Sequence, residues 1–128
     1  MAAISEDRLQ YECVSWYNES FPKMRKCLFH PANELVRDFK QLGVQQSIGY
    51  VIGIQDLFFI YKGMAIAIEM KRPDGKGRVR EKQDKVHQNF KDNGNPTVVC
   101  INLEHFKAII LSFIAYVDSI SKPSFICP

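Results

Sequence analysis

Residues 56–71 read Asp56-Leu57-Phe58-Phe59-Ile60-Tyr61-Lys62-Gly63-Met64-Ala65-Ile66-Ala67-Ile68-Glu69-Met70-Lys71. Two apolar runs typical of β-strands flank the dipeptide Lys62-Gly63, and the other charged residues stand at the outer ends. A two-residue turn at this dipeptide predicts a β-hairpin in which Tyr61 pairs with Met64 and Asp56 lies directly opposite Glu69. A bulge at the turn would instead leave the two acids as a diagonal pair.

Two opposed carboxylates at the end of a hairpin repel each other and require a compensating charge. Directly opposed residues have Cβ atoms about 4.5–5.5 Å apart, and the period of two places Lys71 on the same face as Glu69. A divalent cation such as Mg²⁺ would compensate both acids, because it prefers oxygen ligands. A surface ion network with Lys71 is the alternative. The runs between the acids are apolar on both faces, which favours buried strands whose ends line a pocket rim.

The size and composition of the chain predict one domain, residues 1–128. With 46% hydrophobic and 24% charged residues, it has the composition of a globular protein. The N-terminus lacks the apolar stretch of a signal peptide and no run is long enough to span a bilayer, so we expect a cytoplasmic protein with no membrane partner. The four cysteines form no CxxC pair, which favours reduced structural thiols over a zinc site or disulfides.

The order of predicted elements is α-β-β-β-α-β-α, which indicates an α/β fold. Ser5 and Asn102 are the expected N-caps of the first and last helices, and Gly94 is the expected C-cap of the middle helix. Residues 33–48 are interpreted as helix or loop. The expected elements are a helix from residue 5 to residue 21, a strand at 27–30, hairpin strands at 56–61 and 64–71, a helix at 80–93, a strand at 97–101 and a helix from residue 102 to about residue 117.

Basic residues outnumber acidic ones by five to two between residues 72 and 82. This loop follows the acids and Lys71 directly, where a polyanionic substrate would need positive charge. Pro73, Asp74 and the glycines after them are typical of a turn and predict a mobile loop. A solvated charged loop without a ligand is the alternative.

Two further polar residues fall on apolar helix faces. Glu6 lies on the same side of its helix as the apolar set, and Gln83 interrupts the face formed by Val79, Val86 and Phe90. Glu6 could instead be favoured only by the helix dipole, and Gln83 could be a satisfied buried amide. Their inward placement favours a role near the hairpin acids. The three histidines have no mutual ligand spacing and are interpreted as ordinary.

Taken together, these motifs resemble the PD-(D/E)xK nuclease superfamily and, within it, the short stand-alone bacterial or phage type of the VRR-NUC family. The resemblance covers residues 5 to about 111. Gln55 stands where the family usually has proline, and Leu35 where it often has glycine. The residues that carry the resemblance are Ser5-Glu6-Asp7-Arg8-Leu9-Gln10, Phe29-His30-Pro31-Ala32-Asn33-Glu34, Gly49, Gly53-Ile54-Gln55-Asp56-Leu57, Glu69-Met70-Lys71 and Gln83.

The resemblance implies a restriction-endonuclease-like core with a mixed β-sheet flanked by helices. It implies Mg²⁺- or Mn²⁺-dependent hydrolysis of phosphodiester bonds in DNA, by homodimers that cut branched DNA such as four-way (Holliday) junctions. Asp56, Glu69 and the main-chain carbonyl of Met70 would hold the metal, and Glu6 would complete or support the site. Lys71 would orient and help deprotonate the attacking water, and Gln83 would position the water or Lys71.

The expected DNA contacts lie on the substrate side of this site. The alternatives are a non-catalytic nucleic-acid-binding module, a nuclease that acts on flaps, single strands or RNA, and a nucleotide phosphohydrolase. Contacts to the phosphate backbone carry no sequence information, so we expect substrate choice to depend on shape. The residues in this group are His30, Asn33, Arg37, Arg72, Arg78, Arg80 and Lys82.

Overall fold

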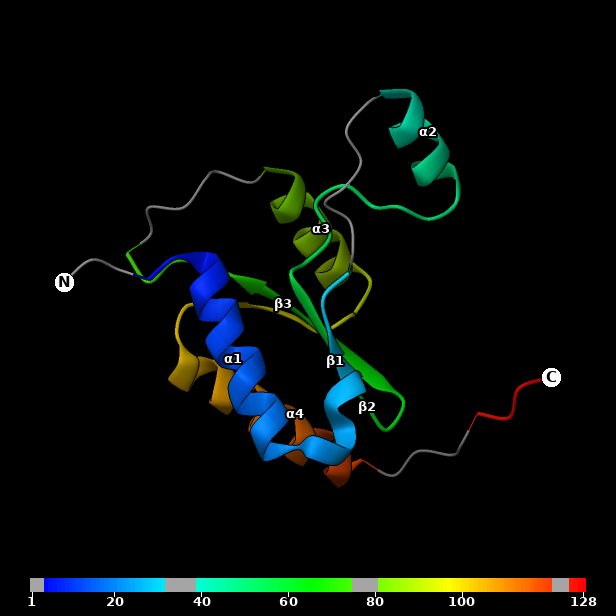
Figure 1. Ribbon diagram of the computed structural model, residues 1–128. Coiled ribbons are helices and arrows are strands. Elements are labelled where there is room, and N and C mark those ends of the chain that lie inside the picture. Colours follow the sequence, from blue (N-terminus) through cyan, green and yellow to red (C-terminus); the bar gives the residue numbers. More distant parts are fainter. Residues whose placement is uncertain (1–3, 32–38, 75–80, 121–124) are drawn as a thin grey trace.

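The computed structural model describes residues 4–31, 39–74, 81–120 and 125–128. A four-stranded mixed sheet with strand order β1-β2-β3-β4 forms its centre (Figure 1). The α/β class and the predicted order are confirmed, with the 3-10 helix η1 as an addition and the short helix α2 within the stretch interpreted as helix or loop. The elements are α1 (Glu6–Ser20), η1 (Pro22–Cys27), β1 (Leu28–Phe29), α2 (Phe39–Ser47), β2 (Leu57–Tyr61), β3 (Met64–Met70), α3 (Glu81–Asp92), β4 (Thr97–Cys100) and α4 (Leu103–Ser119).

The hairpin of β2 and β3 has the predicted register. Lys62 and Gly63 both have positive φ, at 46° and 86°, as a type I′ turn requires. The pairs run without a bulge from Tyr61↔Met64 to Leu57↔Ile68. The next pair in this register is Asp56 and Glu69, just beyond the end of the ladder.

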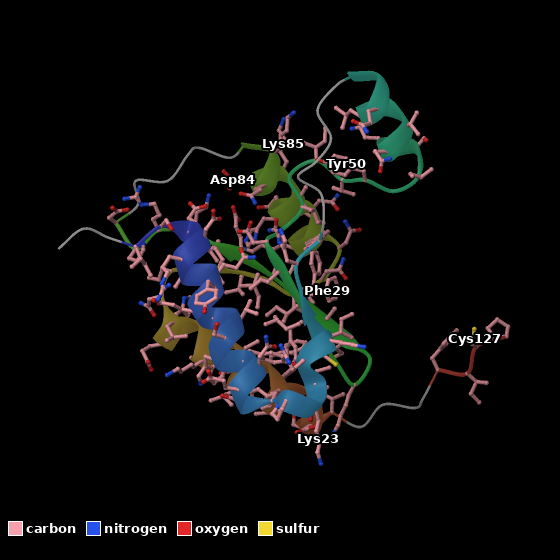
Figure 2. All side chains as sticks on the ribbon, in the orientation of Figure 1. Lys23, Phe29, Tyr50, Asp84, Lys85 and Cys127 are labelled. Carbon is pink, nitrogen blue, oxygen red and sulfur yellow. The ribbon has the colours of Figure 1, made fainter. Side chains whose placement is uncertain are left out.

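The two faces of the sheet are covered by different helices. On one face, Phe59 of β2 makes edge contacts with Tyr17 of α1 and Phe113 of α4. On the other face, Phe58 contacts Phe90 of α3 and stacks on Phe29 of β1, which is labelled in Figure 2. The centre of the hydrophobic core therefore lies between the sheet and the pair α1 and α4.

The burial of the two hairpin strands differs from the prediction in one respect. In β3, residues 66–70 are all buried, as expected for a strand covered on both faces. In β2, burial alternates, and Ile60 is 44% exposed near the turn. On the α3 side, the ring contact between helix and strand is made at Phe58, so the turn end of β2 stays open to solvent.

The predicted helix caps are present. The Ser5 side chain accepts a hydrogen bond from the Arg8 N–H, and the Asn102 side chain accepts one from the His105 N–H. At the end of α3, Gly94 has a φ of 74°, and the Asn95 N–H donates to the Phe90 carbonyl. This is the Schellman arrangement, which ends α3 and turns the chain towards β4.

The cysteines are free thiols, and two of them meet in the core. Cys13 of α1 is hydrogen-bonded to Cys100 at the end of β4, and the Cys100 thiol donates to the Asn102 carbonyl. The hydrogen bond to Cys100 and burial both raise the pKa of Cys13. Cys127, in contrast, is exposed.

Candidate metal centre

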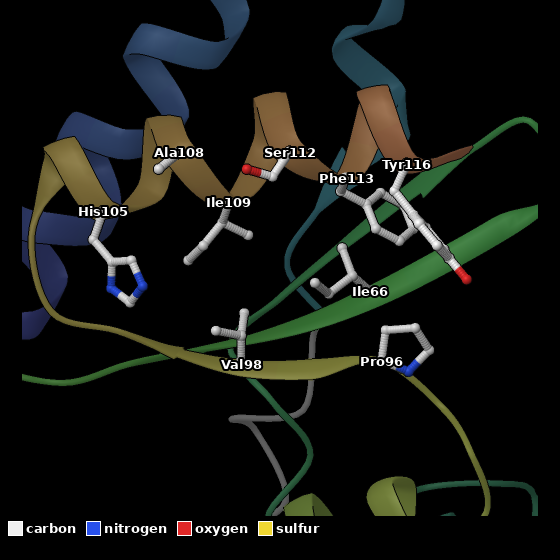
Figure 3. Close-up of a pocket in the computed structure, with 9 residues that line it drawn as sticks. All are labelled: Ile66, Pro96, Val98, His105, Ala108, Ile109, Ser112, Phe113 and Tyr116. Atoms are coloured by element: carbon white, nitrogen blue, oxygen red, sulfur yellow. The ribbon is translucent and has the colours of Figure 1, made fainter. Parts of the chain in front are cut away.

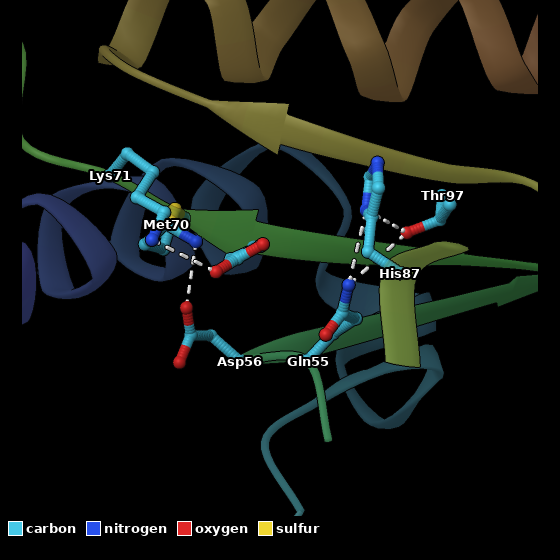
Figure 4. A network of polar contacts seen from close by, with 7 residues as sticks. Gln55, Asp56, Met70, Lys71, His87 and Thr97 are labelled. Carbon is cyan, nitrogen blue, oxygen red and sulfur yellow. Dashed lines mark hydrogen bonds and ion pairs between the residues drawn. The ribbon is translucent and has the colours of Figure 1, made fainter. Parts of the chain in front are cut away.

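Asp56 and Met70 meet where the β2–β3 ladder stops. The Asp56 Oδ2 atom accepts a hydrogen bond of 2.7 Å from the Met70 N–H (Figure 4). The Asp56 carboxylate thus accepts the Met70 N–H, which a backbone carbonyl of β2 would have accepted if the ladder had continued. Because the N–H and C=O of a strand residue point to the same side, the Met70 carbonyl also faces the Asp56 side of β3.

Glu69 is a buried acid with one close cation. Glu69 is 1% exposed, and its Oε1 atom lies 3.2 Å from the Lys71 Nζ atom. This contact is an ion pair, and within the described residues Oε1 accepts no well-aligned hydrogen bond. Burying a carboxylate is costly unless it is paired and hydrogen-bonded. Lys71 offsets one negative charge, so the second carboxylate, Asp56, still favours a cation.

The donor set fits a hard divalent cation. Two carboxylates and one main-chain carbonyl supply oxygen atoms, which Mg²⁺ and Mn²⁺ prefer. Within the described ranges, no three His, Cys, Asp or Glu side chains gather closely enough to form a metal site by themselves. Asp56, Glu69 and the Met70 carbonyl would therefore hold the ion together with water, because Mg²⁺ usually retains several water ligands.

Glu6 lies in the first turn of α1, the helix that covers the opposite face of the sheet from α3. Its Oε1 atom is buried, which agrees with the predicted inward orientation. Since α1 contacts β3, Glu6 is on an element next to the acids. Its part in holding a metal stays a prediction.

Gln83 is buried in the first turn of α3, as its place on an apolar face predicted. The loop that leads to Asp56 passes directly against this turn. A Cβ atom added to Gly53 would lie 2.4 Å from the Lys82 carbonyl carbon and 2.7 Å from the Gln83 nitrogen. Gln83 is therefore held next to the segment that carries Asp56, and its catalytic role stays a prediction.

The expected DNA-binding residues are placed only in part. Exposed His30 has its Nδ1 atom 2.6 Å from the Asp56 main-chain oxygen, so the ring donates to that carbonyl. Arg72 is paired with Asp74 through a contact of 2.7 Å, and Lys82 is exposed in the first turn of α3. Asn33, Arg37, Arg78 and Arg80 lie outside the described residues, as does most of the loop predicted to be mobile.

A polar cluster lies beside Asp56 that the sequence analysis did not predict. Gln55 is 1% exposed, and its Nε2 atom lies 3.2 Å from His87 Nδ1 and 3.4 Å from Thr97 Oγ1. Thr97 Oγ1 is 2.9 Å from His87 Nδ1 (Figure 4). His87 is therefore part of a network, although the sequence suggested an ordinary histidine. The available signal was an amide at the place where the VRR-NUC resemblance has proline.

Known proteins resemble this chain in fold. No protein-family model matches the sequence, and no curated protein matches it. A solved structure described as a "VRR_NUC domain protein" has a TM-score of 0.69 over 90% of this chain and 92% of that chain. The fold is that of a VRR_NUC domain. At 19% sequence identity, the similarity supports the backbone fold alone. The placement of each side chain in the candidate site is supported by its own contacts in this structure.

Proposed function

We propose that this protein is a metal-dependent DNA endonuclease that hydrolyses phosphodiester bonds in branched DNA such as four-way junctions. The observation that carries the proposal is the buried Glu69 carboxylate, with Lys71 at 3.2 Å and Asp56 as its register partner. This arrangement lies at the open end of a hairpin in a VRR_NUC fold. An acid pair with an adjacent lysine suits the hydrolysis of a phosphate ester.

The chain's own residues have separate tasks in this mechanism. Asp56, Glu69 and the Met70 carbonyl would hold Mg²⁺ or Mn²⁺, with Glu6 in support. The bound ion supplies positive charge that polarises the phosphate and lowers the pKa of water. Lys71 would orient the attacking water, and its positive charge would favour loss of the water's proton to the surrounding solvent and stabilise charge that develops on the phosphate oxygens. Gln83 orients the water or the Lys71 ammonium through its amide.

Basic side chains near the site would bind the phosphate backbone. Arg72 follows Lys71 directly, and Lys82 lies in the turn of α3 that contacts the Gly53 loop. These contacts neutralise phosphates without reading bases, so their strength should fall steeply as salt rises. Branched DNA is the proposed substrate because discrimination by such contacts depends on the shape of the backbone.

A homodimer is part of the proposal. An apolar groove of about 550 Å³ lies between α4 and strand β4 at the sheet edge, and Ile109, Phe113, Ile66 and Val98 point into it (Figure 3). Beside it, Tyr116 is 55% exposed. An apolar groove beside an exposed aromatic ring suits contact with apolar side chains of a second copy, and a two-fold pair presents the same groove from both copies. Such a pair also suits a four-way junction, which is larger than the footprint of one small domain.

The function is tested by cleavage assays with Mg²⁺ and with Mn²⁺. Linear duplex, flap, four-way junction, single-stranded DNA and RNA are offered side by side. We expect Lys71→Ala to lose at least about a hundredfold in cleavage rate while it still binds DNA. Lys62→Ala is the matched control, because Lys62 lies at the far end of the same hairpin and pairs with Asp118. Wild-type protein that binds DNA but cleaves nothing would leave the non-catalytic binding module as the answer, and cleavage of RNA alone would contradict a DNA endonuclease.

The homodimer is tested by light scattering on wild type and two arginine variants of α4. Ser112 lines the groove and is exposed, so Ser112→Arg should convert the dimer to a monomer without disturbing the core. Ala115→Arg, on an exposed part of the same helix outside the groove, should remain dimeric. A monomeric wild type would refute the dimer, and a dimeric Ser112→Arg variant would place the interface elsewhere.

A further inference from the structure

The segment that precedes Asp56 is held by groups from two other elements. Gly53 has a φ of 82°, and its backbone packs against the backbone of Lys82 and Gln83 so closely that a Cβ atom does not fit. Two residues later, the Gln55 side chain enters the space between α3 and the sheet, where His87 and Thr97 meet it. The loop is therefore fixed at both residues before the chain reaches Asp56.

The hydrogen bonds of the Gln55 side chain are made by its Nε2 atom, and its buried Oε1 atom has no hydrogen-bond partner among the described residues. The Nε2 amide group has two N–H donors and no acceptor, so one N–H is directed to His87 Nδ1 and the other to Thr97 Oγ1. Thr97 Oγ1 lies 2.9 Å from the same His87 nitrogen, and the tautomer of the ring decides which of the two atoms donates. Three side chains, from the loop, from α3 and from the start of β4, thus share one partly buried cluster (Figure 4).

Asp56 itself receives little support from the sheet. The ladder between β2 and β3 ends at Leu57, so Asp56 has no backbone partner there. Among the described residues, two hydrogen bonds hold the residue: its carboxylate accepts the Met70 N–H, and its main-chain carbonyl accepts from His30. Neither contact fixes the backbone on the N-terminal side of Asp56. Gln55 is the residue at that side, and it is 1% exposed.

We propose that Gln55 is a positioning residue for the metal ligand Asp56, acting through His87 and Thr97. The part of this inference that concerns the metal rests on the proposed function. The part that concerns the position of Asp56 rests on the contacts alone. The side-chain amide holds residue 55 by two hydrogen bonds, where a proline would restrict the backbone by its ring. Groups that orient a metal ligand change metal affinity by roughly ten- to hundredfold when removed.

The test uses two nearly isosteric variants, Gln55→Met and Thr97→Val, which remove hydrogen bonds and keep the side-chain volume. Two readouts are independent of cleavage. The first is the Mn²⁺ dissociation constant, measured from the electron paramagnetic resonance signal of free Mn²⁺. The second is hydrogen exchange of the Met70 amide without metal, because that N–H is bound to the Asp56 carboxylate. The Ile68 amide, in the adjacent ladder pair, is the internal reference for global stability.

We expect about tenfold weaker Mn²⁺ binding in both variants. We also expect the variants to increase the hydrogen-exchange rate of the Met70 amide more than that of the Ile68 amide. Thr97→Ser should keep the Mn²⁺ affinity and the slow Met70 exchange that Thr97→Val loses, because serine retains the hydroxyl group. Gln88→Met is the matched control, since Gln88 is an exposed amide on the same helix that bonds Asp92. If either variant fails to fold, the other decides.

Two results would overturn the positioning role. One is Met70 exchange that changes no more than that of Ile68, and the other is Mn²⁺ affinity within twofold of a wild type that binds the ion. A wild type that binds no Mn²⁺ but whose Met70 amide responds to Gln55→Met would have a different meaning. The placement of Asp56 by Gln55 would stand, and the metal-dependent function would fail.

Discussion

Replacing Gly53 by alanine tests the close approach between the Asp56 loop and α3. Two costs add in this variant. Alanine at a φ of 82° must adopt the left-handed conformation, which costs roughly 1–2 kcal/mol. This cost is partly offset because alanine makes the unfolded chain less flexible than glycine does. In addition, the new Cβ atom lies 2.4–2.7 Å from backbone atoms of Lys82 and Gln83, which cannot rotate away as a side chain would. Overpacking of this kind costs about 1–3 kcal/mol.

Gly94→Ala is the matched control for this clash. Gly94 has a similar φ of 74°, but a Cβ atom there meets nothing within 4 Å. We therefore expect a loss of about 1 kcal/mol for Gly94→Ala and about 2–4 kcal/mol for Gly53→Ala. Urea denaturation followed by far-ultraviolet circular dichroism measures both, with equal m-values as the sign that the comparison is valid. If Gly53→Ala costs no more than Gly94→Ala, the loop does not pack on α3 and the placement of Gln83 beside it is wrong.

Two further predictions concern the core and a helix cap. Burial raises the pKa of Tyr17 from 10.0 to about 12, so its stabilising contribution is complete below pH 10 and is lost as the pH rises from 10 to 12. Absorbance at 295 nm should show this residue titrating last, and Tyr17→Phe should remove that part of the alkaline destabilisation; a Tyr17 that titrates near pH 10 would contradict it. Asn102→Ala should cost about 1 kcal/mol in urea denaturation, because the His105 N–H loses its acceptor, whereas Asn102→Asp should cost much less. Equal losses for the two Asn102 variants would show that the cap contributes little.

The hairpin could be predicted because its signals are local. The Lys62-Gly63 turn and the apolar runs beside it determine the register, and the register places Asp56 opposite Glu69. The caps at Ser5, Gly94 and Asn102 are likewise encoded within a few residues of each helix end. A correct local register was therefore enough to predict that Asp56, Glu69 and Lys71 stand at the same end of the hairpin.

The cluster around Gln55 could not be predicted in the same way. His87 and Thr97 lie 32 and 42 residues further along the chain, and no periodicity relates a loop amide to a helix and a strand that pack on it later. His30 was expected near the substrate, and the structure shows its ring bound to the Asp56 carbonyl, a contact between residues 26 apart. Such contacts exist only after the sheet and α3 have come together.

This difference has a consequence for how Asp56 is held. A proline before an aspartate restricts the backbone by its covalent ring, whether or not the rest of the chain is folded. Gln55 holds the same place only while α3 and β4 are packed, because its partners belong to those elements. Local opening of α3 would then release Asp56 and weaken the proposed metal site. Conversely, a metal that binds only the closed arrangement would stabilise the packing of α3 by linkage. In this chain, the stability of α3 and the affinity for metal should therefore rise and fall together.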